Sequence, residues 1–323
     1  MGERLMRAVR VHAFGGPEAL RCEDVPVPVP QGSQVLVKVE AAGVNPVDTY
    51  IRTGAYARKP ALPYTPGSDA AGTVAALGAE AEGLAVGDRV YTSGTLSGSY
   101  AEYALCERTQ VYPLPTAVDF AQGAALGTPY ATAYRALFQR GSARPGEKLL
   151  IHGATGGVGL AALQLAVAAG MRIFATGGTA EGRALVREQG AHAVFDHHAE
   201  GYLDEIGARS GGIDIVLEML ANVNLDRDLT VLSAGGRVVV VGSRGRIEID
   251  PRATMQRETA IIGMTLFAAT PREVAEIHAA LGAGLANGSL RPVIGKRFSL
   301  ADAGKAHEAI TQTGTCGKII IHF

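Results

Sequence analysis

The sequence predicts an α/β protein in two parts, a compact β-rich unit and a doubly wound parallel sheet. Residues 1–115 consist of short alternating segments separated by glycine turns, which is typical of a small barrel. The sequence pattern changes near Asp119, where an alanine-rich stretch begins, and strand–helix units then recur. A chain of 323 residues is also long enough that two domains are the natural expectation.

The strands expected in the β-rich unit follow the alternation of apolar and polar residues. They are residues 6–14, 34–42, 72–77, 89–92 and 99–105. Val25-Pro26-Val27-Pro28-Val29-Pro30 is expected to be an extended connector, because proline fixes φ and disfavours the helical region before it.

The second part is expected to hold about six parallel strands. One or two helices come first, over residues 120–140, with an interruption at Gly127-Thr128-Pro129. The expected strands are residues 148–152, 172–176, 193–196, 213–218, 237–241 and 259–264. A helix over 271–285 and strand-like ends at 293–298 and 318–323 follow, and we expect this tail to return to the first domain.

Composition excludes several classes of function. The chain is 47% hydrophobic and 19% charged, so it is globular, and its net charge of −1 provides no field to hold nucleic acid or a membrane surface. No apolar run reaches the roughly 18 residues of a membrane span, and no signal peptide is visible. Cys22, Cys106 and Cys316 are far apart and odd in number, which is typical of free thiols in a reducing compartment. We expect a cytoplasmic protein.

A glycine-rich turn at Gly153-Ala154-Thr155-Gly156-Gly157-Val158-Gly159 follows the expected strand 148–152 and precedes a helix over 160–169. This order places a pyrophosphate at a helix N-terminus, where unpaired N–H groups and the helix dipole favour negative charge. The spacing departs from G-x-G-x-x-G because position 155 is threonine. A tight structural turn without a nucleotide is therefore the competing interpretation.

The end of the second parallel strand favours NADPH as the cofactor. NAD sites usually have an acid there for the ribose 2′-hydroxyl, whereas this chain has Thr176-Gly177-Gly178-Thr179. A 2′-phosphate would not be repelled, and Gly178, Thr179 and Arg183 could donate to it. The alternative is that the acid is displaced, for example to Glu181.

Five separate segments resemble the zeta-crystallin branch, the NADPH:quinone oxidoreductases of the medium-chain dehydrogenase/reductase superfamily. They are residues 43–50 (GVNPVDTY), 62–69 (LPYTPGSD), 152–159 (HGATGGVG), 218–225 (EMLANVNL) and 241–245 (VGSRG). The resemblance runs from about Leu5 to the C-terminus. It implies a GroES-like β-barrel catalytic domain from residues 1–124 and 268–323, and a Rossmann domain, the doubly wound parallel sheet, over 125–267.

The resemblance also implies the site residues. Tyr50, from the barrel domain, would lie near the nicotinamide and face the acceptor, with Asn45 nearby. Thr155, Gly156, Gly157 and Val158 would hold the pyrophosphate, and Gly178 and His197 the adenosine end. Asn224, Val241, Gly242, Ser243, Arg244, Met264, Thr265 and Leu266 would line the nicotinamide half. Taken alone, each of these residues also has an ordinary structural interpretation, as core, turn or solvated side chain.

No metal is expected. The zinc-containing alcohol dehydrogenases of the superfamily carry cysteine where this chain has Asn45, and Gly-His-Glu where it has Gly67-Ser68-Asp69. Asparagine and serine are poor zinc ligands, and the cysteine-rich lobe of those enzymes is absent. Without a Lewis acid to polarise an alcohol or carbonyl, the chain favours an acceptor that takes electrons readily.

The resemblance therefore implies an NADPH-dependent quinone reductase, with transfer of one electron at a time, giving a semiquinone, or of two. The alternative enzyme reduces the activated double bond of enones or 2-alkenals with NADPH. A third interpretation is binding of AU-rich RNA or a structural crystallin role, and the net charge gives RNA no support. A homodimer or homotetramer is expected, because residues 259–266 form an apolar strand at the expected sheet edge.

Overall fold

The computed structural model describes residues 4–323 as two compact units, each of which is treated by itself below. Unit 1 comprises Met1–Thr128 with Arg291–Phe323, and unit 2 comprises Pro129–Leu290. The expected domains, 1–124 with 268–323 and 125–267, differ from this division chiefly over residues 268–290. Those domain boundaries stay a prediction. Within residues 4–323, no helix combines the length and the apolar character needed to cross a bilayer.

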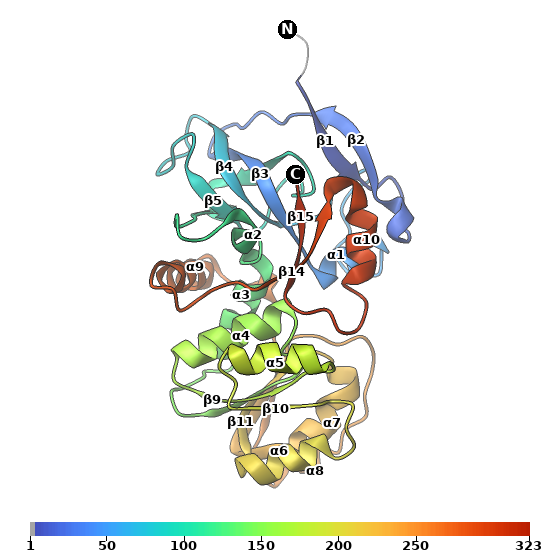
Figure 1. Cartoon of the computed structure of the whole chain (residues 1–323), viewed down its shortest axis with the longest axis vertical. Coiled ribbons are helices and arrows are strands. Elements are labelled where there is room, and N and C mark those ends of the chain that lie inside the picture. Colours follow the sequence, from blue (N-terminus) through green and yellow to red (C-terminus); the bar gives the residue numbers. More distant parts are fainter. Residues whose placement is uncertain (1–3) are drawn as a thin grey trace. The chain divides into compact units, whose positions relative to one another are not determined.

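The body of unit 1 is a seven-stranded sheet of order β14-β15-β3-β4-β5-β7, with β6 paired to β3, and β1 and β2 form a separate antiparallel pair (Figure 1). All pairs in the larger sheet are antiparallel except β14 with β15. The strands are β1 (Leu5–Arg10), β2 (Arg21–Pro26), β3 (Gln34–Val44), β4 (Asp69–Leu77), β5 (Arg89–Thr92), β6 (Tyr103–Glu107), β7 (Val111–Pro113), β14 (Ile294–Ser299) and β15 (Lys318–His322). The helices are η1 (Pro17–Ala19), α1 (Pro46–Arg52), η2 (Arg108–Gln110), α2 (Phe120–Gly123), η5 (Leu300–Asp302) and α10 (Ala303–Ala309).

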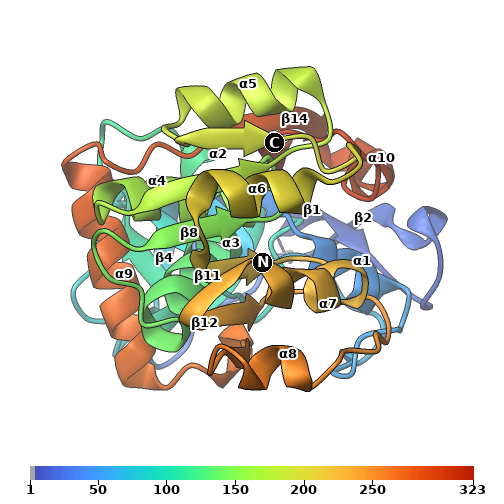
Figure 2. The ribbon, with the colours of Figure 1, turned by 90° about the horizontal axis from the view of Figure 1, so that it is seen from below.

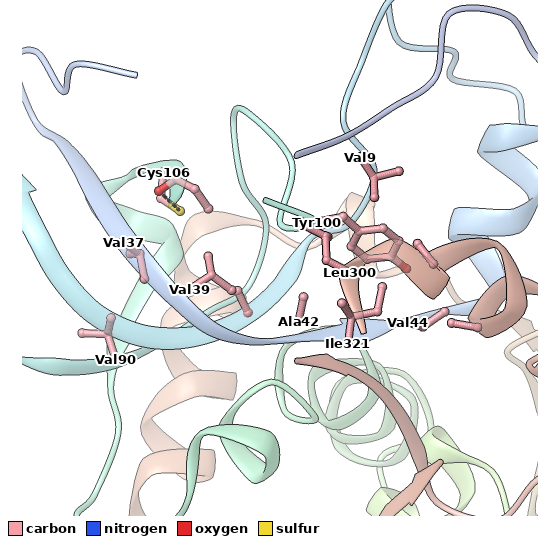
Figure 3. Packing of buried hydrophobic residues seen from close by; sticks show 14 of the residues in the cluster. Val9, Val37, Val39, Ala42, Val44, Val90, Tyr100, Cys106, Leu300 and Ile321 are labelled. Atoms are coloured by element: carbon pink, nitrogen blue, oxygen red, sulfur yellow. Dashed lines mark hydrogen bonds between the residues drawn. The ribbon is translucent and has the colours of Figure 1, made fainter. Parts of the chain in front are cut away.

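The core of unit 1 gathers the inward residues of strands that are distant in sequence. Val37 of β3, Val90 of β5 and Ile321 of β15 meet Tyr100 and Leu300 in one buried cluster (Figure 3). Apolar and polar residues therefore alternate along β3 because one face of this sheet is covered by apolar side chains.

The C-terminal tail returns to unit 1, as expected. Strand β15 pairs antiparallel with β3, so that Ile319 is opposite Val44, and β14 adds in parallel beyond it. The first strand is shorter than expected, because β1 ends at Arg10. The expected connector is strand as far as Pro26, where β2 ends.

Unit 2 contains six parallel strands in the order β10-β9-β8-β11-β12-β13, which confirms the doubly wound sheet (Figures 1 and 2). The strands are β8 (Lys148–Ile151), β9 (Arg172–Thr176), β10 (Ala193–Phe195), β11 (Ile213–Glu218), β12 (Leu232–Val240) and β13 (Ala260–Gly263). The helices are α3 (Gly127–Tyr134, whose first two residues belong to unit 1), η3 (Arg135–Arg140), α4 (Gly157–Ala168), α5 (Ala180–Glu188), α6 (Tyr202–Ser210), α7 (Ala221–Val231), α8 (Arg252–Met255), η4 (Leu266–Ala268) and α9 (Pro271–Ala286).

Helices cover both faces of this sheet. Figure 1 shows α4 and α5 on one face and α6 and α7 on the other. Leu203 and Ile206 of α6 and Leu229 of α7 pack on Val216 and Val238 of the central strands. Residues 127–129 begin α3 instead of interrupting a helix, because proline is tolerated in a first helical turn.

Candidate active site

A glycine turn joins β8 to α4 and carries the four residues expected at the pyrophosphate. Gly153 has φ +58°, in the left-handed region that favours glycine. A Cβ at Gly153 would meet no atom within 4 Å, and one at Gly156 only the Gly153 carbonyl at 3.7 Å. Helix α4 begins at Gly157, and its N-cap residue Gly156 has no side chain to accept from the first N–H groups. These N–H groups and the helix dipole therefore fit a pyrophosphate.

The turn is held in place by β9 and by close packing of α4. Thr176, at the end of β9, accepts from Gly153 N through Oγ1 (3.1 Å) and from Ala154 N through its carbonyl (2.9 Å). A Cβ at Gly159 would lie 2.6 Å from Ala154 Cα. Only glycine at this position lets the helix approach the turn so closely.

The loop after β9 has the features expected for a 2′-phosphate. Thr179 caps α5, and its Oγ1 accepts from Gly182 N at 3.1 Å, which leaves the hydroxyl hydrogen available. A Cβ at Gly178 would lie 2.8 Å from His197 Nε2 and 2.9 Å from His198 Nε2. The structure therefore brings Gly178 and His197 together. Glu181, the alternative acid, is exposed in the first turn of α5.

Arg183 adds a fixed cation beside this loop. Its Nη1 donates to the Gly177 carbonyl (3.1 Å) and pairs with Asp196 Oδ2 (2.8 Å). The pKa of Asp196 is lowered, first by the backbone N–H of His198 and then by Arg183. The pKa of His197 is lowered mainly by desolvation and then by the neighbouring His198. His198 was not among the expected residues, although its place directly after His197 was a signal.

The expected nicotinamide residues of β11 and β12 lie at the carboxyl ends of these strands. Val241 N and Gly242 N donate to the backbone carbonyl of Glu218, at 2.8 and 3.2 Å. Arg244 N donates to Asn222 Oδ1 at 2.8 Å, and Ser243 and Arg244 are exposed. Ligands of open α/β sheets bind at this edge.

Asn224 is attached to the same strand end. Its Nδ2 donates to Glu218 Oε1 at 3.2 Å, and the backbone N of Leu220 also donates to this oxygen. One carboxyl group therefore holds both the start of α7 and the Asn224 side chain.

The segment after β13 carries Met264, Thr265 and Leu266. Met264 N donates to Val240 O at 3.1 Å, so this segment adjoins the end of β12. Buried Arg135 donates through Nε to the Thr265 carbonyl (3.2 Å) and pairs with Glu273 (2.8 Å). Arg135 was missed, because nothing in its local sequence connects it with a segment 130 positions away.

In unit 1, Tyr50 lies on α1, whose start is fixed by Asn45. The backbone N of Asn45 donates to Asp48 Oδ2 at 2.8 Å in a capping box, and Pro46 occupies the first turn. Tyr50 is half-buried, and its carbonyl accepts from Ala55 N at 3.0 Å.

The side chain of Asn45 belongs to a buried polar centre. Its Nδ2 donates to Asp69 Oδ2 (2.8 Å), and its Oδ1 accepts from Lys318 Nζ (2.5 Å). Lys318 also reaches Asp69 Oδ2 at 3.2 Å, and Asp69 Oδ1 accepts from the backbone N and hydroxyl of Thr128 at 2.8 and 2.7 Å. The pKa of Lys318 is lowered mainly by burial. Lys318 was missed by the sequence analysis.

A second buried chain of polar groups lies beneath α1. Asp48 Oδ2 accepts from the Tyr100 hydroxyl at 3.2 Å, and that hydroxyl is 3.1 Å from His307 Nε2. Burial raises the pKa of Asp48 to about 7 and lowers that of His307 to about 3. His307 is therefore neutral at physiological pH.

Comparison with known proteins begins with two family models. Residues 31–116 match the "Alcohol dehydrogenase GroES-like domain" and residues 157–281 match "Zinc-binding dehydrogenase". The parallel sheet of unit 2 is accordingly a Rossmann domain, and unit 1 is GroES-like.

The full-length relatives are more specific. The chain is 56% identical to the quinone oxidoreductase of Homo sapiens over 99% of this chain and 98% of that protein. This chain belongs to the quinone oxidoreductase (zeta-crystallin) family. The quinone oxidoreductase of Rattus norvegicus is 53% identical over the same shares. The crystal structure of the Escherichia coli quinone oxidoreductase complexed with NADPH matches with a TM-score of 0.89 at 28% identity, covering 98% of this chain and 100% of that one.

Proposed function

We propose that this chain reduces quinones with NADPH. The full-length identity to quinone oxidoreductases carries the proposal. The loop after β9 supports the choice of cofactor, because it has no acidic side chain and brings Thr179, Arg183 and His197 to Gly177 and Gly178. When bound, NADPH supplies the electrons for the reduction.

We assign the cofactor-binding residues by the part of NADPH that each would contact. Thr155, Gly156, Gly157 and Val158 hold the pyrophosphate through backbone N–H groups. Gly178, Thr179 and His197 bind the adenosine end. Asn224, Val241, Gly242, Ser243, Arg244, Met264, Thr265 and Leu266 bind the nicotinamide half. The support is that each set lies at the carboxyl ends of the parallel strands.

Tyr50 is proposed to contact the quinone or the nicotinamide through its ring. Positioning two reactants in this way accelerates electron transfer without any proton transfer by the ring. Asn45 is proposed to act by positioning other residues, because its amide is buried and both of its polar atoms already have partners in Lys318 and Asp69. It fixes the start of the helix that presents Tyr50.

The proposed reaction needs no metal. Lys318 Nζ lies 2.5 Å from Asn45 Oδ1 and 3.2 Å from Asp69 Oδ2, so a protein cation already satisfies this polar centre. A divalent ion there would be repelled by the ammonium group. Metal analysis of the active protein tests this, and one zinc per chain lost together with activity on chelation would refute it.

The cofactor proposal is tested by titration with NADPH and NADH, followed by fluorescence. NADPH should bind at least about tenfold more tightly, which is about 1.4 kcal/mol. Arg183→Met should weaken binding of NADPH and leave that of NADH unchanged, because only NADPH carries the 2′-phosphate. Equal affinities of the unchanged protein for NADPH and NADH would mean that the 2′-phosphate does not contribute to binding.

A panel of acceptors tests the substrate class. NADPH oxidation should be fast with ortho- and para-quinones and slow with enones and 2-alkenals. Reduction of the enones alone would establish the double-bond reductase instead. A salt-dependent titration with AU-rich RNA tests the third interpretation, and the net charge of −1 predicts no binding.

We further propose a homodimer, or a tetramer built from it, through the edge of the Rossmann sheet. Strand β13 ends the strand order, and Ile261 on it is 37% exposed. An open apolar edge of this kind favours pairing with a second copy. Ile261→Lys should give a monomer in light scattering at micromolar concentration, whereas Val86→Lys, at an exposed position in unit 1, should not. A monomeric unchanged protein would refute the proposal.

A further inference from the structure

Three ionisable side chains lie together beneath the nucleotide-binding edge of unit 2. His152 follows β8, Glu218 ends β11 and Asp228 lies on α7, and all three are buried. His152 Nε2 is 2.8 Å from Asp228 Oδ1 and 3.6 Å from Glu218 Oε2.

If both carboxyl groups are ionised, one buried oxygen of each lacks a hydrogen-bond donor. Among the residues that the structure describes, Glu218 Oε2 and Asp228 Oδ2 are buried oxygens without a donor. Burial raises the pKa of both groups to about 7 and lowers that of His152, so the imidazole is neutral and does not balance two negative charges. A proton held between the two carboxyl groups supplies the missing donor and removes one charge.

We propose that Glu218 is a positioning residue for the nicotinamide half of the cofactor site and that it acts as a neutral acid sharing its proton with Asp228. This inference rests on the proposed NADPH function. With the proton directed towards Asp228, Oε1 stays an acceptor for Leu220 N and Asn224 Nδ2. The same residue accepts from Val241 N through its backbone carbonyl.

The proton links these contacts to pH. When it leaves, two buried carboxylates face each other, and their repulsion displaces the start of α7 and Asn224. The other groups around the pair are His152 after β8, Arg227 on α7 and Tyr202 on α6, and His197, after β10, acts on His152. Arg227 alone among them carries a positive charge at neutral pH, and it is exposed to solvent, which weakens its effect. NADPH affinity should therefore fall as the pH rises above neutrality.

The test compares Glu218→Gln with the unchanged protein in NADPH titrations from about pH 6 to about pH 9. A neutral amide reproduces the shared-proton state, since its oxygen accepts from Leu220 N and its NH2 group donates to Asp228. The unchanged protein should lose about tenfold in affinity over this range, and Glu218→Gln should keep the low-pH affinity throughout. Glu147→Gln, which alters a partly exposed ion pair with Arg237 in the same unit, should retain the unchanged protein's pH profile.

Infrared spectroscopy gives a second measurement. Buried Asp48 of unit 1 also has a pKa of about 7, so the spectrum of Glu218→Gln is subtracted from that of the unchanged protein, and the difference should show the C=O band of a protonated carboxyl group at about pH 6 that disappears by about pH 9. The proposal is overturned if the band is absent, if Glu218→Gln loses affinity at every pH, or if it keeps the original pH slope. Because the three ligand-type atoms lie within 4.8 Å of one another, a stoichiometric divalent cation bound there would also overturn it. A protein that binds NADPH with no pH dependence refutes this inference alone, whereas one that binds no NADPH refutes the proposed function.

Discussion

Replacing Lys318 by methionine tests the polar centre of unit 1 most directly. The ammonium group is buried and contacts Asn45 Oδ1 at 2.5 Å and Asp69 Oδ2 at 3.2 Å. Methionine has a similar length and no charge, so the change leaves the Asp69 carboxylate, which is fully buried, without its cation. Removing one partner of a buried ion pair costs about 3–5 kcal/mol of stability. Thr128 still donates two hydrogen bonds to Asp69, which places the expected loss near the lower end.

The assay is urea unfolding followed by circular dichroism, with Lys305→Met as the matched control. Lys305 pairs with Asp302 at 2.8 Å but is 71% exposed, so its replacement should leave the free energy of unfolding nearly unchanged. The double variant Lys318→Met with Asp69→Asn removes both charges, and it should be more stable than the sum of the single losses predicts. A loss below about 1 kcal/mol for Lys318→Met, or strict additivity in the double variant, would refute the reasoning.

Three further predictions concern single side chains. Tyr50→Ala should lower kcat/KM for quinones by about 1–3 kcal/mol while Tyr50→Phe changes it little, and an unchanged rate in steady-state NADPH oxidation would place the ring outside the site. Gly159→Ala should weaken NADPH binding, since its Cβ would lie 2.6 Å from the backbone of the turn. Gly282→Ala, whose Cβ would have no atom within 4 Å, should instead stabilise α9 by about 0.5–1 kcal/mol in urea unfolding. Burial raises the pKa of the Cys106 thiol to about 12. Iodoacetamide at about pH 8 should therefore alkylate the half-buried Cys316 and spare Cys106. Mass spectrometry of the labelled peptides measures this, and alkylation of Cys106 would contradict the prediction.

The fold was predictable where local sequence decides the structure. Strands β9 and β11 and the start of α9 at Pro271 agree with the expected bounds, because buried parallel strands are short apolar runs and Thr270 caps the helix. The first strand was predicted too long, since apolar and polar residues still alternate after Arg10, where β1 ends. Alternation shows that a segment can be a strand, and the pairing partner decides how far it runs.

The candidate site also has one part that the local sequence predicts and other parts that depend on contacts between distant residues. The glycine turn was predictable because its geometry depends on a strand, a turn and a helix that are consecutive in sequence. Lys318 could not be predicted, because its contact with Asn45 spans 273 positions and depends on the pairing of β15 with β3. The group of His152, Glu218 and Asp228 was missed for the same reason, since two strands, β8 and β11, and the helix α7 bring it together.

The position of β15 constrains the order in which the chain can fold. This last strand lies between β14 and β3, and unit 1 therefore lacks an internal strand of its sheet until the final residues are available. Residues 129–290 form unit 2 within one continuous stretch and can fold while the ribosome is still adding the tail. During that interval residues 41–44 of β3 expose an unpaired edge, which is a hazard for aggregation during synthesis. Closing the sheet requires contacts of very large sequence separation, so we expect completion of unit 1 to limit the rate of folding.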